Sequence, residues 1–590
     1  MKIDYEKIRS STTFTLNIVM IVVTILALVS LIINLSGIEL TPSAQRNLAI
    51  FDWTIVFIFV ANTFIRWGLN KFDLLYLKQN WADFVLTFSF LIILIVLLGY
   101  SPMSDTTDWL PLFINLAIVR VFVILTRLYI VGSPVIKILS LRGKKTDSKL
   151  APAQLFVASF IFVILMGTGL LLLPEATVGN HISIVDALFT ATSATCVTGL
   201  IVVDTGSYFT LFGQLVILVL IQIGGLGLMT FTTFFSFLIR RNISVRESVF
   251  MSSTMNIKAL SNVSRLLIST LTLTLSFEFI GTILIYIGWW GESFEWGSTL
   301  YYSIFHSISA FCNAGFSLFA NNLENYKSNF VVGMTVSSLF IIGGLGFIVI
   351  INLLHFFKLG IFKKEKLSLH TKVVLTLTAI LIVTGFLIIL STEWNNALAN
   401  LPLSTKIMGA YFHSVTPRTA GFNIINMTQL TNVCYFMIII FMFIGASPGG
   451  TGGGIKTTTF GVFLGTIWAM LRGRTSIEAF KRSVPRDIMT NALLLITLSL
   501  MFLAGFAFIL LITEDAPPLH ILFELFSAFG TVGLSAGITP YLTHIGKLII
   551  IITMFIGRVG PLTMVLAIGQ IRQRRKNVEF QYPEESVIIG

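Results

Sequence analysis

Four glycines, Gly199, Gly315, Gly421 and Gly533, recur at intervals of roughly 110 residues, as in an internally repeated protein. Each follows two small, polar or β-branched residues and precedes a large apolar residue. The preceding pairs are Val197 and Thr198, Asn313 and Ala314, Thr419 and Ala420, and Thr531 and Val532. Glycine accepts the left-handed backbone that lets successive carbonyl oxygens face one axis, and rings of carbonyls can replace the water around a cation. The repeat therefore predicts a four-part ion filter, in preference to four helix-packing glycines.

A short segment of mixed polar, aromatic and small residues precedes each of these glycines. The four segments are Asp186–Cys196, Thr299–Cys312, Ser404–Arg418 and Leu519–Thr531. Each is too short to cross a bilayer, which takes about 20 apolar residues. A segment that enters the membrane and returns must bury its non-helical backbone or line water, and a half-helix there points one end of its dipole at an ion. We therefore expect four pore helices that end at the filter.

A second set of glycines lies about 25 residues beyond the first, within the apolar segment that follows each filter segment. In the third repeat this set expands into a run that contains Gly445, Pro448, Gly449, Gly450, Gly452, Gly453 and Gly454. The run cannot remain a regular helix, because each Gly costs up to about 1 kcal/mol and Pro about 3 kcal/mol relative to Ala. In lipid such a break persists only where it lines a cavity. It predicts an intramembrane loop below the filter, with an ordinary loop between two short helices as the alternative.

Three basic residues lie close to these motifs. Arg558 interrupts the apolar segment 548–568, and an arginine at membrane depth is a functional hypothesis by default. We expect it to face the pore; an arginine bonded between helices is the alternative. Lys456 lies two residues after the last glycine of the run. It would either pair inside the cavity or mark its cytoplasmic end. Arg418 would either brace the third filter segment or pair with an acid such as Glu524.

The other ionisable residues of the pore region give no catalytic or metal-binding pattern. His306 and His413 lie in equivalent pore segments, but no set of Cys, Asp or Glu accompanies them, so we expect no metal apart from cations at the filter carbonyls. Glu278, in a membrane segment, has no assigned role. The sequence contains no Ser-His-Asp set and no phosphate-binding loop. We therefore expect no enzyme and no covalently bound cofactor.

The composition shows which class of protein holds these residues. Of 590 residues, 55% are hydrophobic and only 11% are charged, which excludes a water-soluble domain and predicts a membrane protein with several spans. The net charge is +12, and the Lys and Arg residues cluster in alternate connections between the apolar segments. This distribution is the positive-inside pattern of membrane proteins and does not indicate a nucleic-acid-binding surface. We expect both termini in the cytoplasm. Three cysteines in apolar or pore segments make no disulfide framework.

The apolar segments around each pore segment predict a unit of helix, pore loop and helix that repeats four times. The expected outer helices are 153–173, 262–288, 371–391 and 488–513, and the expected inner helices are 208–239, 328–357, 432–470 and 543–571. The fold class is therefore an all-α polytopic membrane protein with four repeats around one pseudo-fourfold pore. The repeats are assigned to residues 151–258, 259–366, 367–486 with the intramembrane loop, and 487–590 with a cytoplasmic tail.

Residues 1–150 precede the first repeat, and the basic linker Leu141–Pro152 marks the boundary between the two. They contain four helix candidates, at about 12–35, 51–67, 81–99 and 110–131. Acidic residues in or beside the middle helices, and Arg120 and Arg127 in the last, resemble the outline of a voltage sensor. Two arginines carry too little charge for a steep response to voltage. We interpret this block as a structural four-helix bundle.

The four repeats, the single filter glycine in each and the glycine-rich interruption of the third inner helix resemble the Trk/Ktr/HKT superfamily of potassium transporters. The similarity is greatest to the bacterial KtrB or TrkH membrane subunit, and it covers residues 153–575. It implies potassium permeation, because in this family Gly at all four filter positions goes with potassium and Ser at the first goes with sodium. It also implies that the glycine-rich loop and Arg558 act as a gate.

The resemblance further implies a homodimer in a bacterial inner membrane, surrounded by lipid, and a cytosolic nucleotide-binding ring subunit as regulator. The basic connections 240–265 and 472–486 are either docking surfaces or topology signals alone. Coupling to Na⁺, and therefore symport, stays open. The block 1–150 exceeds a simple member of the family, so its role is not carried over.

Two other functions fit parts of the same pattern. The potassium-binding subunit of an ATP-driven pump shares the pore-loop repeat but requires an ATPase partner. A single-chain cation channel with a sensor domain would need a sensor before each repeat and carboxylates in the filter, and the sequence has neither. The favoured prediction is a potassium uptake channel or transporter, which flux into liposomes without ATP would distinguish from the pump subunit.

Overall fold

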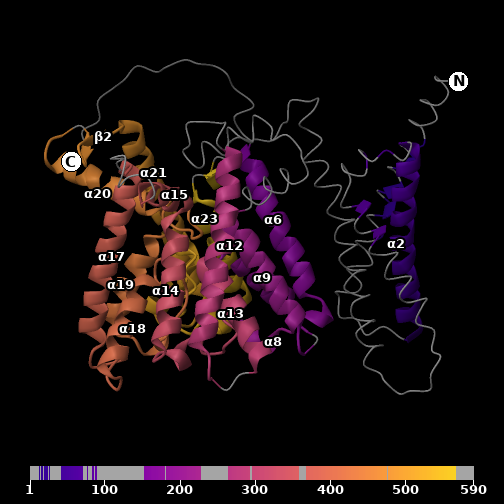
Figure 1. Cartoon of the computed structure of the whole chain (residues 1–590), viewed down its shortest axis with the longest axis horizontal. Coiled ribbons are helices and arrows are strands. Elements are labelled where there is room, and N and C mark those ends of the chain that lie inside the picture. The colour runs from indigo at the N-terminus through magenta and orange to yellow at the C-terminus, as the bar shows by residue number, and fades with distance from the viewer. Residues whose placement is uncertain are drawn as a thin grey trace, which may run out of the picture.

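In the computed structural model, long outer helices alternate along the chain with shorter ones (Figure 1). The structure describes residues 152–179, 181–227, 263–292, 295–357, 367–474, 476–561 and 563–565, and in the first 150 residues 42–70 together with isolated positions. Helix α2 (Pro42–Leu69) contains the predicted helix 51–67 and begins earlier. The predicted helix 110–131, with Arg120 and Arg127, lies outside the described residues.

Each repeat consists of an outer helix, a pore helix and an inner helix. The outer helices are α6 (Pro152–Leu171), α12 (Val263–Gly288), α17 (Leu369–Glu393) and α21 (Arg486–Thr513). The pore helices are α7 (Ile184–Cys196), α13 (Trp296–Phe311), α18 (Leu403–Val415) and α22 (Pro518–Gly530). The inner helices begin as α9 (Leu211–Leu226), α14 (Phe330–Leu345), α19 (Asn432–Phe443) and α23 (His544–Val559). The expected helix order is present in all four repeats.

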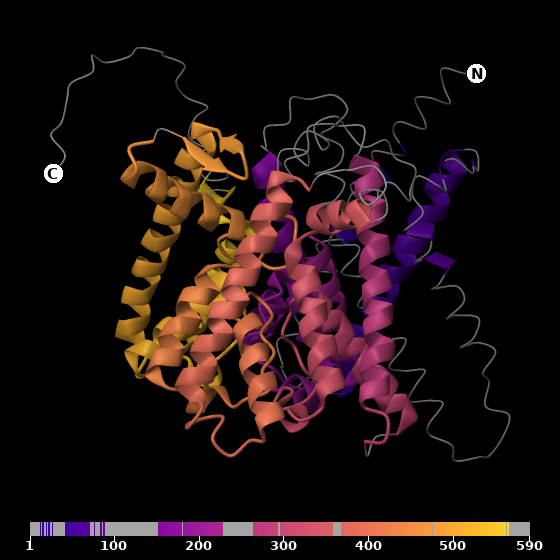
Figure 2. The ribbon, with the colours of Figure 1, turned by 60° about the vertical axis from the view of Figure 1, so that its left-hand side comes forward.

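Short elements complete the described chain. Two helices, α15 (Phe347–His355) and α20 (Thr457–Leu471), follow the inner helices of repeats 2 and 3. Strands β1 (Ile477–Ala479) and β2 (Arg482–Val484) form an antiparallel hairpin before α21. The remaining turns of helix are η1 (Pro174–Ala176), α8 (Thr205–Tyr208), η3 (Glu324–Tyr326), η5 (Met427–Gln429) and η6 (Thr539–Tyr541). Figure 2 shows the hairpin at one end of the bundle of long helices.

Three of the four outer helices, all except α6, have the length and apolar composition of membrane spans. Three described helices are long and apolar enough to cross a bilayer alone, namely Ile268–Gly288, Leu369–Glu393 and Arg486–Thr513, and α14 with α15 passes as one bent span. Their outward side chains are exposed and apolar, as with Phe279 and Phe508, which are 67% and 68% exposed. Such a surface is stable in lipid and not in water. The chain is therefore an integral membrane protein.

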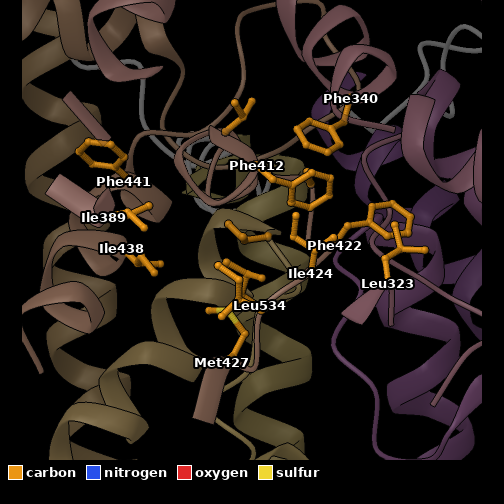
Figure 3. Packing of buried hydrophobic residues seen from close by; sticks show 14 of the residues in the cluster. Leu323, Phe340, Ile389, Phe412, Phe422, Ile424, Met427, Ile438, Phe441 and Leu534 are labelled. Atoms are coloured by element: carbon orange, nitrogen blue, oxygen red, sulfur yellow. The ribbon is translucent and has the colours of Figure 1, made fainter. Parts of the chain in front are cut away.

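The pore helices lie in the interior, where apolar side chains from several repeats cover them. One equivalent phenylalanine in each, Phe189, Phe305, Phe412 and Phe523, is fully buried. In Figure 3, Phe412 of α18 lies beside Phe340 of α14 and Phe422, within a cluster that also includes Leu534 of the fourth repeat. Truncating a buried Phe to Ala typically costs about 3–5 kcal/mol. This packing fixes the height at which each pore helix ends.

The inner helices are shorter than the sequence predicted. Helices α9, α14 and α23 end before Gly227, Gly346 and Gly560, whose φ angles are 79°, 91° and 92°, whereas the predicted helices ran on to 239, 357 and 571. A left-handed glycine is a common end for a helix because it has no Cβ to clash. After Gly346, α15 leaves at 97° to α14. The predicted continuous helix 328–357 is therefore wrong. Residues 228–239 and 566–571 lie outside the described part of the chain.

Two buried carboxylates hold the inner helices of repeats 3 and 4 at their first turn. Glu393, the last residue of α17, accepts hydrogen bonds from Thr431 N at 3.0 Å and from its Oγ1 at 2.6 Å. Glu514, directly after α21, accepts one from Thr543 N at 3.0 Å. Thr431 and Thr543 are the N-caps of α19 and α23. Each carboxylate thus ties an outer helix to the inner helix of the same repeat.

We expect Glu393→Ala to lower the unfolding temperature of the detergent-solubilised protein by about 5 °C or more, because two donors of the half-buried Thr431 lose their acceptor at about 1–3 kcal/mol each. Glu393→Gln, which keeps an acceptor of the same shape, should lose less. Glu478→Ala is the control, since the ion pair of Glu478 with Arg474 is exposed and worth little. Equal melting temperatures for Glu393→Ala and the control would contradict this role.

Candidate functional site

The four glycine segments share one unusual backbone conformation. In each, the residue two before the glycine and the glycine itself have positive φ, with 57° at Val197 and 89° at Gly199 in the first. The other pairs are Asn313 and Gly315, Thr419 and Gly421, and Thr531 and Gly533. A left-handed conformation costs a non-glycine residue about 1–2 kcal/mol. Its recurrence at four equivalent positions marks the segments as a candidate site.

The four glycines form a closed ring in chain order. A Cβ built on Gly199 would lie 3.1 Å from Gly315 Cα, one on Gly315 2.9 Å from Gly421 Cα, and one on Gly421 3.3 Å from Gly533 Cα. A Cβ on Gly533 would lie 2.9 Å from Gly199 Cα, which closes the circle. Three of these Cβ atoms would also overlap a carbonyl oxygen of the neighbouring segment, those of Ala314, Val532 and Thr198. The ring therefore has no space for side chains at these positions.

A hydroxyl near the end of each pore helix holds the segment that follows. Ser193 Oγ donates to Leu200 O at 2.7 Å, Ser309 Oγ to Phe316 O at 2.7 Å, and Thr416 Oγ1 to Phe422 O at 2.6 Å. In the fourth repeat Gly533 N donates to Ser527 Oγ at 3.1 Å. These braces are not among the residues predicted from the sequence. Their signal was a hydroxyl about six residues before every ring glycine.

The pore helices present their carbonyl ends to the ring. Helix α7 ends at Cys196, directly before the left-handed Val197, and α22 ends at Gly530, directly before the left-handed Thr531. The C-terminus of a helix carries a partial negative charge of about half a unit. Together with the ring carbonyls, these ends favour a cation over an anion or a neutral molecule.

Glycines of the inner helices pack tightly against the ends of the pore helices. A Cβ on Gly224, Gly343 or Gly557 would overlap the carbonyl oxygen of Thr195, Phe311 or Phe529, respectively. Close helix packing is therefore the role of these three glycines. The same contacts support the ring from the side of the glycine-rich loop.

The glycine-rich loop, residues 445–456 between α19 and α20, is buried below the ring. Ser447 and Thr451 are 0% and 1% exposed, so these residues of the loop pack inside the protein. Ser447 N donates to Gly344 O at 3.0 Å and Thr451 N to Gly343 O at 3.1 Å, and Gly454 N donates to Gly557 O at 3.2 Å. The loop therefore starts in repeat 3 and is bonded to the inner helices of repeats 2 and 4.

Arg558 joins the same loop to the first repeat. Its guanidinium donates to Thr451 O in the loop and to Gly224 O at the end of α9. Lys456 Nζ donates to Gly452 O at 2.7 Å, so Lys456 pairs within the loop. Among the described residues, no carboxylate forms an ion pair with either side chain. Two basic side chains without a carboxylate partner in the described part of the chain therefore lie beside the loop. The guanidinium of Arg558 repels a cation that approaches it.

Arg418 and Glu524, for which a pairing was one expectation, have separate environments. Glu524 accepts hydrogen bonds from Ser535 Oγ at 2.5 Å, Ala536 N at 3.0 Å and Thr539 Oγ1 at 2.8 Å. Arg418 is 7% exposed, and its Nε has no partner among the described residues. The expected ion pair does not occur. Glu524 instead holds the chain that follows the fourth segment.

The buried histidines and Glu278 have structural partners. His306 contacts Tyr302 O at 2.8 Å and Ser317 Oγ at 2.9 Å. Glu278 accepts a hydrogen bond at 3.0 Å from Gln222 Nε2, which links α12 to α9. In the described part of the chain, no three His, Cys, Asp or Glu side chains come close enough to hold a metal ion.

Comparison with known proteins gives one consistent result. The family model TrkH, described as a cation transport protein, matches residues 124–579. The chain is 39% identical over 460 residues to the potassium/sodium uptake protein NtpJ of Enterococcus hirae, covering 77% of this chain and 100% of that protein. It is 41% identical over 444 residues to the Ktr system potassium uptake protein B of Bacillus subtilis, covering 75% of this chain and 97% of that protein.

The fold is similar to a solved structure as well. The crystal structure of the potassium transporter TrkH from Vibrio parahaemolyticus aligns with a TM-score of 0.59 at 16% identity, covering 75% of this chain and 90% of that chain. Residues 1–123 lie outside the family match.

Proposed function

Because this chain belongs to the TrkH family of cation transport proteins, we propose that it is a potassium uptake protein of a bacterial inner membrane. The observation that carries the proposal is the closed ring of Gly199, Gly315, Gly421 and Gly533. The relatives described above are named as uptake or transport proteins and not as enzymes. The function is therefore the movement of an ion and not a chemical reaction.

In this proposal the filter consists of the four segments 197–199, 313–315, 419–421 and 531–533. Their left-handed residues direct carbonyl oxygens to one axis, where they take the place of the hydration shell of K⁺. The hydroxyl braces hold the segments in place before the ion binds. Ser193 Oγ, for example, accepts a hydrogen bond from Gly199 N at 3.1 Å and donates one to Leu200 O at 2.7 Å. Little further ordering is then needed when the ion enters, which favours rapid transfer.

The gate consists of the glycine-rich loop and Arg558. The hydrogen bonds of the loop to Gly343, Gly344 and Gly557, together with the bridge by Arg558, correspond to a closed arrangement. A cation about 4 Å from the guanidinium would meet a repulsion of roughly 4 kcal/mol at an effective dielectric constant near 20. A glycine backbone moves with few side chains to repack, so the loop is suited to open and close.

We further propose a homodimer that is regulated by a cytosolic nucleotide-binding ring subunit. The hairpin between α20 and α21 supports a cytosolic docking surface, because Arg474, Lys481 and Arg482 are exposed there. Its position beyond the cytoplasmic ends of these helices follows the positive-inside pattern. The relative NtpJ is named a potassium/sodium uptake protein, so Na⁺ is the second ion to include in transport measurements.

The proposal is tested with the purified chain in liposomes that contain K⁺ on one side and no ATP. We expect K⁺ to move down its concentration gradient faster than in protein-free liposomes, because a filter and a gate need no ATP hydrolysis. The same chain should restore growth of a potassium-uptake-deficient bacterium at low K⁺. Flux that appears only with ATP and an added ATPase subunit would favour a pump and contradict the proposal.

A further inference from the structure

Three filter segments point a polar side chain toward the glycine-rich loop. Asn313, Thr419 and Thr531 each begin a filter segment, and each is completely buried. Their backbone is left-handed, with φ of 59°, 71° and 51°. A buried polar side chain must find a hydrogen-bond partner or lose about 1–3 kcal/mol. The partners of these three side chains therefore show what the lower edge of the filter contacts.

The partners are the loop and one another. Thr451 Oγ1 lies 3.1 Å from the carboxamide of Asn313 and 3.3 Å from Phe311 O at the end of α13. Gly453 N donates to Thr531 Oγ1 at 2.9 Å. The carboxamide of Asn313 also lies 3.2 Å from Thr419 Oγ1. The backbone carbonyl oxygen of the same Thr451 accepts the hydrogen bond from the guanidinium of Arg558. One residue of the loop thus contacts the filter through its side chain and the gate arginine through its backbone.

The fit between loop and filter explains why the loop consists of glycine at this point. A Cβ on Gly452 would overlap Thr419 Oγ1, and a Cβ on Gly453 would lie 2.6 Å from Thr531 Oγ1. A carbon atom cannot approach a hydroxyl oxygen this closely at either position. The loop can contact the filter only where its residues have no side chain, as at Gly452 and Gly453. The glycines of the loop therefore allow this close contact as well as backbone movement.

We propose that Asn313 and Thr531 are positioning residues that latch the loop to the filter, so that opening of the loop changes the filter itself. The inference rests on the proposed filter and gate. The residues that hold the loop are the same strained residues whose carbonyl groups line the filter. When the loop leaves, both side chains lose a partner and their left-handed backbone loses a restraint. Loop opening and ion preference are therefore coupled.

Coupling of this kind is reciprocal: an ion that binds one filter conformation better also favours one loop position. A loop that only blocks the pore would change the rate for K⁺ and Na⁺ by the same factor. A latched loop changes the two rates by different factors. The ratio of K⁺ to Na⁺ flux is thus a readout that simple obstruction does not move.

The test uses the hydroxyl of Thr451, which lies in the loop and not in the filter. Thr451→Val removes the hydroxyl at nearly constant shape, and Thr451→Ser keeps it. The control is Thr457→Val, because in the described part of the chain Thr457 Oγ1 has a single hydrogen-bond partner, Ser447 Oγ at 3.0 Å. K⁺ and Na⁺ fluxes are measured for each variant in liposomes and normalised to the amount of inserted protein.

We expect Thr451→Val to raise K⁺ flux about five-fold, the effect of one hydrogen bond on the closed state, and to change the K⁺/Na⁺ ratio. Thr451→Ser should restore both values, and Thr457→Val should leave the ratio unchanged. An unchanged ratio in Thr451→Val, whatever its rate, overturns the coupling. If deletion of 449–454 raises flux and Thr451→Val does not, the latch is overturned while the gate stands. If the parent protein conducts no K⁺, the proposed function itself fails.

Discussion

Replacing Gly199 by Ser is expected to lower K⁺ uptake by about 5- to 30-fold, the effect of 1–2 kcal/mol on an equilibrium, and to reduce the preference for K⁺ over Na⁺. Gly199 has φ of 89°, and a Cβ there would overlap Ala314 O in the adjacent segment. The left-handed backbone costs a residue with a Cβ about 1–2 kcal/mol. Relief of the overlap must move a carbonyl of the second segment, and this changes how the ring replaces the hydration shell.

Gly297→Ser is the matched control, since a Cβ on Gly297 meets no atom within 4 Å although the residue lies in pore helix α13. K⁺ and Na⁺ uptake are measured in a potassium-uptake-deficient host, with the membrane content of each variant determined by immunoblot. The control should transport as the parent does. A Gly199→Ser protein with parental uptake and ion preference would show that Gly199 does not line the filter.

The sequence was most informative where a pattern repeated. Four glycines at one period, each after a segment too short to span the membrane, predicted the pore helices to within a few residues of α7, α13, α18 and α22. Repetition separates such a signal from the chance occurrence of glycine in an apolar chain. The long outer helices followed from their unbroken apolar length.

The ends of the inner helices were predicted less well, for a physical reason. Gly224 and Gly227 are close in sequence, yet Gly224 packs in the helix and Gly227 ends it with φ of 79°. Glycine is compatible with both roles, and only the neighbouring backbone decides between them. The continuous helix 328–357 was wrong at Gly346 because Phe347 N bonds to Gly449 O of a distant loop at 3.1 Å. A pattern of neighbouring residues in the sequence cannot predict such a distant hydrogen-bond partner.

The candidate site was likewise predictable in outline and not in its connections. The glycine run indicated a loop below the filter, and Arg558 stood out because an arginine in an apolar segment is costly. Which carbonyls that arginine would bind depends on three separate repeats meeting at one place. The contacts of Thr451 with Asn313 and of Gly453 with Thr531 join residues from different repeats. Such pairs leave no periodic signal in a single sequence.

The proposed gate gives the second large expected effect. Arg558→Ala should raise K⁺ flux about ten-fold or more, because the loop loses a charge-assisted hydrogen bond to Thr451 O, worth about 1.5–3 kcal/mol, and the cavity loses a positive charge. Deleting residues 449–454 should raise flux as well, since it removes the obstruction. A residue with only a structural role would instead give lower expression or lower flux when removed.

Arg558→Lys separates the two causes of the barrier. Lysine keeps the charge, but its point-like ammonium lacks the planar fork of arginine, so it cannot reproduce the bridge from Thr451 O to Gly224 O. Flux near the parental value in Arg558→Lys would assign the barrier to charge, and flux near that of Arg558→Ala would assign it to the bridge. All rates are measured in liposomes and divided by the amount of inserted protein. If Arg558→Ala and the deletion both insert well and conduct no faster than the parent, the loop and Arg558 are not the gate.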